Sequence, residues 1–333
     1  MIDSDNRSNL SDVVVTALVI SWNTRDLLRE CLASLFAVAK TVPLQIVVVD
    51  NASEDGSADM VAEVFPQAEL IRNDYNAGFG VANNIGFKCA RGRYLLLLNP
   101  DALFDDPPAL TNWIAAMEGD PRIAASGAYL IDGEGRHRLG DAGFRPTWRS
   151  IVGLYWFLGR LIPNWFPPYF LAQQSATCVD VDWVSGAAML VRRSRLDDVG
   201  GFDERIFMYG EDVEWCCRMR DSGYRVVHFP SIRITHFEGA SGRKQKRPGY
   251  SYLWFRQMRA LYFHYQPRQP AWIFDVILLV GLGVRVAGYG AMRLLNNNEF
   301  SRNRIRQHLT CMGFLCRQFG RRGEAWRGQR VGQ

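Results

Sequence analysis

Three short groups of residues in this sequence carry side chains that could do chemistry. They are the segment Asn99–Asp101, which directly follows an apolar run, the acidic pair Glu211 and Asp212, and the single residue His236. Carboxylate oxygens suit a hard cation, and Mg²⁺ usually takes only one or two carboxylates from a protein. A carboxylate can also be the general base that takes a proton from an attacking hydroxyl group, and a neutral imidazole can complete a metal shell.

Each group also has an ordinary structural explanation. An aspartate that follows a strand is common in turns. Consecutive acids near a helix N-terminus are stabilised by the helix dipole, and a single histidine is often a structural residue. No group decides the matter alone, so their meaning depends on the elements that position them.

Strands that alternate with helices are predicted to position these groups. Continuous apolar runs are typical of strands covered on both faces, and apolar residues at helical spacing predict the helices between them. The expected strands span 13–20, 46–49, 69–72 and 94–98, and the expected helices span 26–39, 53–65 and 81–90. This order predicts an α/β fold with a Rossmann-like, mostly parallel sheet flanked by helices.

Polar residues stand where the predicted strands end. Asn23, Asp50, Asn51, Asn99 and Asp101 each closely follow a buried strand. In open parallel sheets, ligands bind beyond the carboxyl ends of the strands. The repeated placement therefore predicts one binding site at this edge of the sheet.

The second half of the chain is expected to complete the domain. Later strands are predicted over 183–191, which contains the small residue Gly186, and over 224–229 and 232–236, with helices over 212–222 and 251–265. The first of these helices would place the acidic pair in its first turn.

Composition and charge are those of a globular protein, with 48% hydrophobic and 22% charged residues and a net charge of +5. Basic residues gather over 243–247 and 317–330, where they could face solvent or anionic lipid. These clusters are short and follow no known module, so nucleic acid is not an expected partner.

The seven cysteines include no CxxC pair, which indicates reduced thiols. The polar residues 1–11 do not resemble a signal peptide, so we expect a disordered tail and a cytoplasmic protein.

Taken together and in this order, the motifs resemble those of the family-2 inverting glycosyltransferases of the GT-A fold, and above all the bacterial rhamnosyltransferase-like branch. The matching segments are VVVDNASEDGS (47–57), NDYNAGFGVANNIG (73–86), LLLLNPDA (95–102), SGAAMLVRR (185–193), GGFDERIFMYGEDVEWCCRMR (200–220) and HFEGAS (236–241). The resemblance covers about residues 13–242, and a run of motifs of this length is specific.

The resemblance implies roles for individual residues on the donor side. Asp50 and Asn51 would hold the base and ribose of a nucleotide-diphosphate sugar, with Asn23 nearby. The other residues expected to bind substrate are Asn76, Gly78, Phe79, Asn83, Asn99 and Gly186.

The resemblance also implies a divalent cation, Mg²⁺ or Mn²⁺, and a catalytic base. Asp101 would be the metal-binding acid that the family writes as the last residue of D-x-D. Asn99 occupies the first position here, so one carboxylate is lost. His236 would be the second protein ligand, and Asp212 would be the catalytic base, supported by Glu211. One displacement would then invert the anomeric configuration.

The expected substrates follow from the same resemblance. The donor would be a dTDP-activated rhamnose or a UDP-activated hexose, which the sequence does not separate. The acceptor would be a growing cell-surface glycan or a polyprenyl-linked lipid at the inner membrane face.

Three other functions fit the sequence less well. The segment Gly78–Asn83 begins like the G-x-G-x-x-G of an oxidoreductase, but its last position is asparagine and it follows the third strand instead of the first. A sugar nucleotidyltransferase would need a glycine-rich, basic loop where SWNT (21–24) stands. A non-catalytic nucleotide-sugar-binding module is disfavoured because Asp101, Asp212 and His236 are all present.

Two apolar regions lie outside the shared motifs. Residues 151–171 are rich in aromatic residues and proline, as expected of a loop-rich acceptor wall or a membrane-facing patch. Residues 271–295 are apolar but contain Asp275, Arg285 and Arg293, and therefore fall short of a spanning helix of about 20 nearly uncharged residues. They fit a helix in a bilayer interface or packed helices. We expect a catalytic domain over 12–242 and a helical, basic extension over 243–333 that could be membrane-associated.

Overall fold

The computed structural model describes residues 13–171, 177–237, 250–296 and 299–321. The expected tail over 1–11, the basic cluster over 243–247 and most of the C-terminal basic cluster lie outside these ranges. The strands of the main sheet are β1 (Val15–Ser21), β2 (Leu44–Asp50), β3 (Glu69–Arg72), β4 (Tyr94–Leu98), β5 (Ala102–Leu103), β6 (Ile123–Ile131), β8 (Val179–Val181), β10 (Ala188–Arg192) and β11 (Arg225–His236). A second, two-stranded sheet is formed by β7 (Ala142–Gly143) and β9 (Trp183–Val184).

The helices lie between and after these strands. They are α1 (Arg25–Val38), α2 (Ser57–Val64), α3 (Phe79–Phe87), α4 (Pro108–Glu118), α5 (Trp148–Tyr155), α6 (Leu158–Leu161), α7 (Arg195–Val199), α8 (Glu211–Asp221), α10 (Tyr250–Tyr265), α11 (Ala271–Asn296) and α12 (Glu299–Gln318).

The main sheet is mostly parallel, as predicted. Its order is β3-β2-β1-β4-β10-β6-β11-β5, with β8 also paired to β11. Neighbouring strands from β3 to β4 are parallel, as are β6 and β11, whereas β5, β8 and β10 pair in the antiparallel sense. The carboxyl ends of the parallel strands therefore meet at one edge of the sheet.

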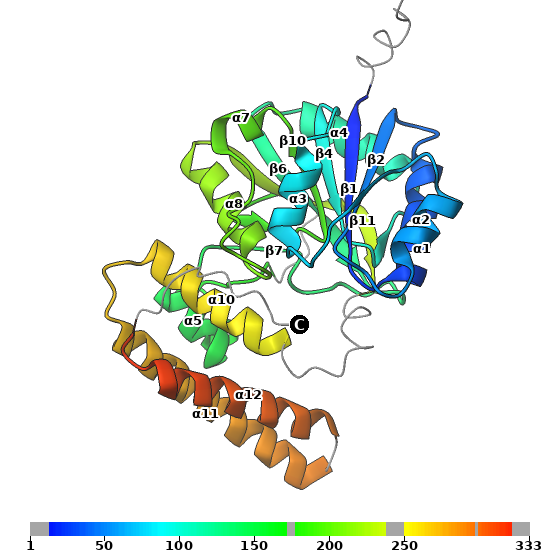
Figure 1. Ribbon diagram of the computed structural model, residues 1–333. Coiled ribbons are helices and arrows are strands. Elements are labelled where there is room, and N and C mark those ends of the chain that lie inside the picture. Colours follow the sequence, from blue (N-terminus) through cyan, green and yellow to red (C-terminus); the bar gives the residue numbers. More distant parts are fainter. Residues whose placement is uncertain (1–12, 172–176, 238–249, 297–298, 322–333) are drawn as a thin grey trace, which may run out of the picture.

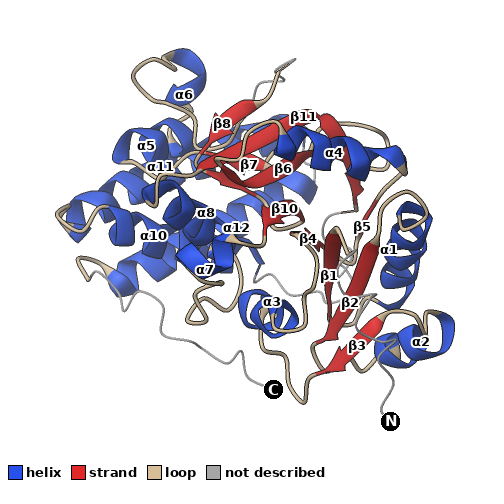
Figure 2. Ribbon diagram, turned by 90° about the horizontal axis from the view of Figure 1, so that it is seen from above, coloured by secondary structure: helices blue, strands red, loops and turns tan. Residues whose placement is uncertain are grey.

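Helices cover both faces of the sheet (Figure 2). Successive residues of a strand point to opposite faces, so a strand covered on both faces has to be apolar throughout. In β4, Leu96 and Leu98 pack in the core beneath α1, α2 and α4, while Leu95 and Leu97 pack in the core that α3 and α8 cover. This double burial explains the continuous leucine run, since each buried leucine contributes about 1.5–3 kcal/mol.

A third core joins α5, α10, α11 and α12 (Figure 1), on the side of the sheet where the parallel strands end. Tyr262 of α10 stacks on Phe274 of α11 with ring centroids 3.9 Å apart. Arg259 of α10 binds Asp275 of α11 through two hydrogen bonds of 2.8 and 2.9 Å. Both side chains are buried, so the acid that interrupts the apolar segment is neutralised inside the protein.

Several predicted elements need correction. The strand expected over 183–191 is broken at 185–187 into β9 and β10, which belong to different sheets. The strands expected over 224–229 and 232–236 form the single strand β11, with a register shift between Phe229 and Arg233. Pro230 lies in this shift and has no N–H to donate to a neighbouring strand.

The aromatic and apolar regions also differ from the prediction. Residues 151–171 were expected to be loop-rich, but α5 and α6 lie at their start. Thr147 caps α5 and accepts a hydrogen bond from the Ser150 N–H. By length and composition alone, Ala271–Leu294 is apolar enough to cross a membrane, so the expectation that it falls short is wrong. The core helix of a soluble protein can be equally long and apolar, so one such helix does not by itself show that the chain crosses a membrane.

Candidate functional site

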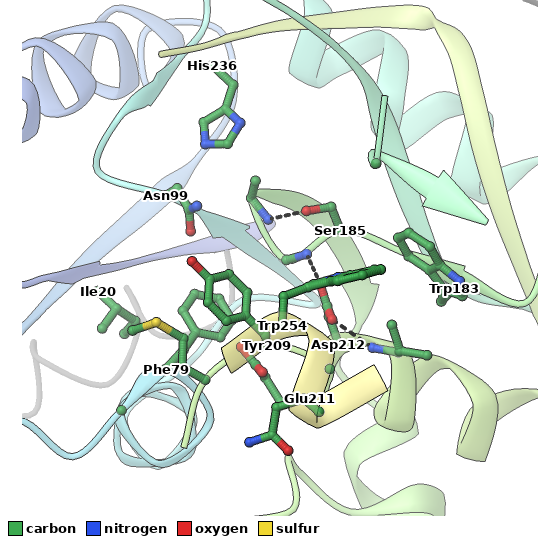
Figure 3. Close-up of a pocket in the computed structure, with 18 of the residues that line it drawn as sticks. Ile20, Phe79, Asn99, Trp183, Ser185, Tyr209, Glu211, Asp212, His236 and Trp254 are labelled. Carbon is green, nitrogen blue, oxygen red and sulfur yellow. Dashed lines mark hydrogen bonds between the residues drawn. The ribbon is translucent and has the colours of Figure 1, made fainter. Parts of the chain in front are cut away.

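A cleft of about 690 Å³ lies between the carboxyl ends of the central strands and α10. Most of the predicted site residues line it. They are Asn51, Asn76, Gly78, Phe79, Asn99, Asp101, Gly186, Glu211, Asp212 and His236. Asn23, Asp50 and Asn83 are absent from the described residues that line the cleft. Figure 3 shows His236 and Asn99 on one side of this cleft and the acidic pair on another.

Asp212 is fixed by two backbone N–H groups. The Gly186 N–H donates to Asp212 Oδ2 at 3.0 Å, and the Val213 N–H donates to Oδ1 at 2.8 Å (Figure 3). Gly186 lies in the break between β9 and β10, and a methyl group built on its Cα would lie 2.9 Å from Phe79 Cε1. Gly186 therefore lets the backbone approach both the Phe79 ring and the carboxylate, a function that its predicted substrate contact did not include.

The acidic pair has unusual electrostatics because the Glu211 carboxyl is buried and the Asp212 carboxyl is only partly exposed. Burial and the neighbouring charge of Asp212 raise the pKa of Glu211 to about 8. Burial also raises the pKa of Asp212, but the Gly186 and Val213 N–H groups act against this rise. Glu211 Oε2 is buried without a hydrogen-bond partner among the described residues. Near neutral pH, Asp212 is therefore the better placed of the two to carry the negative charge.

Asp101 and His236 are brought together by the sheet. His236 pairs with Ala102 where β11 lies beside β5, and the Phe237 N–H donates to the Asp101 carbonyl at 2.8 Å. As a result His236 Nε2 lies 3.1 Å from Asp101 Oδ1. Both side chains are largely buried and line the cleft.

As metal ligands, these two residues alone would make an incomplete shell. Within the described ranges, no cluster of three or more histidine, cysteine or acidic residues could hold a metal ion. One carboxylate and one imidazole still suit a cation whose other ligands are diphosphate oxygens and water, since Mg²⁺ keeps several non-protein ligands. The donor set therefore fits a cation that arrives with a nucleoside diphosphate.

The other wall of the cleft is built around a glycine turn. Gly78 has a φ of +84°, and a side chain there would meet the Phe207 carbonyl oxygen at 2.3 Å. The Asn76 side chain accepts the Gly78 N–H at 3.0 Å, and the Asn51 side chain donates to the Gly78 carbonyl at 3.2 Å. Asparagine side chains thus hold the turn that presents Phe79.

The three residues that do not line the cleft support its wall. Asn23 accepts the Glu54 N–H, and Asn83 donates to the Phe79 carbonyl. Asp50 Oδ2 accepts the Ser53 N–H, whereas its Oδ1 is buried with no described partner. The predicted contact of Asp50 with a donor base therefore stays a prediction.

One wall of the cleft is aromatic and apolar and comes from distant segments, of which the sequence predicted only the possible acceptor wall over 151–171. Tyr169, Phe170 and Tyr209 contribute to it, together with four residues of α10, which are Trp254, Gln257, Met258 and Leu261. The Phe170 and Trp254 rings stack with centroids 6.0 Å apart. The apolar stripe of α10 was visible in the sequence, but α10 lies beyond the boundary expected at residue 242.

Comparisons with known proteins agree on one family. A sequence model described as "Glycosyl transferase family 2" matches residues 16–200. The chain is 28% identical over 243 residues to an N-acetylglucosaminyl-diphospho-decaprenol L-rhamnosyltransferase of Mycobacterium tuberculosis, covering 68% of this chain and 77% of the relative. It is 31% identical over 233 residues to a rhamnosyltransferase of Escherichia coli, covering 67% of this chain and 83% of the relative.

The fold is also similar to that of a solved structure. A mannosyltransferase of Pyrobaculum calidifontis, in complex with GDP-Man and Mn²⁺, superposes with a TM-score of 0.57. The match covers 90% of this chain and 86% of the other, at 18% sequence identity. At this identity the likeness concerns the fold alone.

Proposed function

This chain belongs to glycosyl transferase family 2 and is a glycosyltransferase of the rhamnosyltransferase branch, and we propose that it moves a rhamnose-like sugar or a hexose from a dTDP- or UDP-activated donor to an acceptor hydroxyl group. The acceptor is a lipid-linked or growing cell-surface glycan. The names of the relatives support this choice, because two are rhamnosyltransferases and a third, from Myxococcus xanthus, is an O-antigen biosynthesis protein. The cytoplasmic side of the membrane, with peripheral contact, is the matching location.

The anchored carboxylate of Asp212 is the observation that carries the proposal. Its two N–H donors fix its position in the cleft, so a lone pair can meet an acceptor hydroxyl. Asp212 takes the hydroxyl proton while the acceptor oxygen bonds to the anomeric carbon. The bond from that carbon to the diphosphate oxygen breaks, and its electron pair leaves with the nucleoside diphosphate. A single displacement of this kind inverts the anomeric centre.

Asp101 and His236 are the residues that would hold Mg²⁺ or Mn²⁺. A divalent cation supplies charge neutralisation for the departing diphosphate. Asn99 lines the cleft beside them and is fixed by its backbone N–H, which donates to the Ala187 carbonyl at 2.9 Å. Its amide adds no charge, so metal affinity is expected to depend strongly on the diphosphate itself.

Calorimetric titration tests this function directly. Purified protein is titrated with dTDP, UDP and GDP, each with Mn²⁺ and with EDTA. Binding of dTDP or UDP that requires the metal is the expected result. Equal binding in EDTA would argue against the proposed metal pair, and failure of a folded sample to bind any nucleotide would argue against the donor site.

A further inference from the structure

Charged side chains of the helix α11 face the protein, and several of its apolar side chains face outward. Asp275 points inward to Arg259, and Arg285 donates to the Tyr155 and Leu154 carbonyl groups of α5. Between Trp272 and Met292, by contrast, every exposed position is apolar or glycine. A helix on the surface of a soluble protein normally shows the opposite arrangement.

The exposed apolar side chains form a continuous stripe. Trp272, Val276, Val280 and Val284 recur every fourth residue and are 56, 41, 45 and 45% exposed. Four-residue spacing places them on one side of a helix. The exposed residues Ala287 and Ala291 continue this side, and the stripe to Ala291 is about 28 Å long at 1.5 Å per residue. Figure 1 shows α11 and α12 as the outermost layer, farthest from the sheet.

A group of arginines lies beside the end of this stripe. Arg293 directly follows Met292, and it lines a surface hollow with Arg302, Arg306 and Arg317 of α12. None of these four guanidinium groups forms an ion pair with a carboxylate of the described ranges. The hollow therefore carries positive charge with no counter-charge from that part of the protein.

We propose that the docking face, defined as the stripe from Trp272 to Ala291 together with these four arginines, binds a bilayer rich in anionic phospholipid. The apolar stripe enters the boundary between headgroups and acyl chains, and the arginines bind lipid phosphates. The helix lies in the plane of the interface because its inner face is bonded to α5 and α10 through Arg285 and Asp275. A hollow with four arginines on the same pair of helices as an apolar stripe favours lipid over a second copy of the chain, because α11 and α12 expose only Glu299 among the acidic residues of their described parts.

The helix α10 separates the docking face from the cleft. Met258 and Leu261 of α10 line the cleft, and Tyr262 of the same helix stacks on Phe274 of α11. Docking would thus hold the cleft close to the headgroups. If the proposed function is correct, this position suits an acceptor whose sugar is attached to a membrane lipid, although lipid binding itself does not depend on that function.

Vesicle flotation of the full-length protein tests the proposal without donor or acceptor, so its result is separate from the test of transfer. Vesicles contain phosphatidylcholine alone or with phosphatidylglycerol. We expect the protein to float with the anionic vesicles and high salt to weaken binding. Each arginine contributes about fivefold, equal to about 1 kcal/mol near an anionic surface, so Arg302→Gln with Arg306→Gln should weaken binding about 25-fold. Val280→Asp should weaken it by about tenfold or more.

Matched variants control for surface charge and exposure. Val64 of α2 is 46% exposed, close to the 45% of Val280, and Arg29 is an exposed arginine of α1. Val64→Asp and Arg29→Gln should float like the unchanged protein, and all variants should keep its melting temperature. Unchanged flotation of Val280→Asp would overturn the proposal. So would a dimer in sedimentation velocity that Val280→Asp dissociates, or binding to RNA in preference to the anionic vesicles.

Discussion

The Gly186 N–H and the Asp212 carboxylate are joined by a 3.0 Å hydrogen bond across the floor of the cleft. One partner lies where a strand is interrupted, and the other lies in the first turn of α8. The position of the candidate base therefore depends on an irregular segment between β9 and β10.

Replacing Asp212 by asparagine tests the base. The amide keeps the shape of the side chain but cannot take a proton, so we expect transfer to fall by about 10²–10⁴-fold while dTDP or UDP binding stays within a few-fold. Single-turnover kinetics and calorimetry measure the two effects. Transfer at near the original rate would place the base elsewhere.

Gly186→Ala tests the close approach beneath Phe79. The added methyl group would lie 2.9 Å from the ring, so either the ring or the backbone that holds Asp212 has to move. We expect kcat to fall clearly while the melting temperature changes little, because the change displaces the base more than it disturbs the core. Adding Phe79→Leu should restore part of kcat by making room, and no recovery in the double variant would show that the contact is not the cause.

The Glu211 carboxyl makes stability depend on pH. Its pKa is raised to about 8 in the folded protein from an ordinary value of 4.5. The folded state therefore retains a proton that the unfolded chain has released, and stability falls as pH rises between these two values. Glu211→Gln removes this loss. Its stability relative to the unchanged protein should increase over this window, by no more than about 1.4 kcal/mol per pH unit, and then level off. Urea unfolding at several pH values measures it, and a constant difference would contradict the raised pKa.

His236→Ala tests the metal pair. Loss of one of two protein ligands should raise the Mn²⁺ concentration for half-maximal transfer by about tenfold or more, while saturating metal restores most of the rate. The control is the fold of the metal-free protein, so the circular dichroism spectrum in EDTA should not change. An unaltered metal requirement would remove His236 from the shell.

Arg259→Met leaves the buried carboxyl of Asp275 without its ion-pair partner, and of the hydrogen bonds described for this carboxyl only that from the Gly320 N–H, at 3.0 Å, remains. We expect a loss of about 3–5 kcal/mol in the C-terminal helices, and much less for the double variant with Asp275→Leu, which leaves no charge unpaired. Unfolding in denaturant, monitored by protease cleavage of the C-terminal helices, measures the stability of the single and the double variant. Equal destabilisation by the single and double variants would mean that shape, not charge, explains the pair.

The regular half of the fold was predictable because its signals are local. Glu69–Arg72 and Tyr94–Leu98 form strands with the predicted bounds, since each apolar run is bounded by polar residues or turns. The break at Gly186 was not predictable in the same way, because the apolar residues on both sides continue the strand pattern and only the approach of Phe79 and Asp212 explains it. The contribution of α10 to the cleft depends on tertiary packing, which no local pattern encodes.

The pairing of β5 with β11 has a consequence for folding. Asp101 and His236 are 135 residues apart in the chain, and contacts between distant residues form late because a long loop has to close first. The two-residue strand β5 and the end of β11 hold them together. A cation and a nucleotide would bind only where Asp101 and His236 are already together, that is, in the complete fold. Their binding would therefore stabilise the whole domain by mass action. Donor and metal together would then favour the last step of folding, in which β5 pairs with β11.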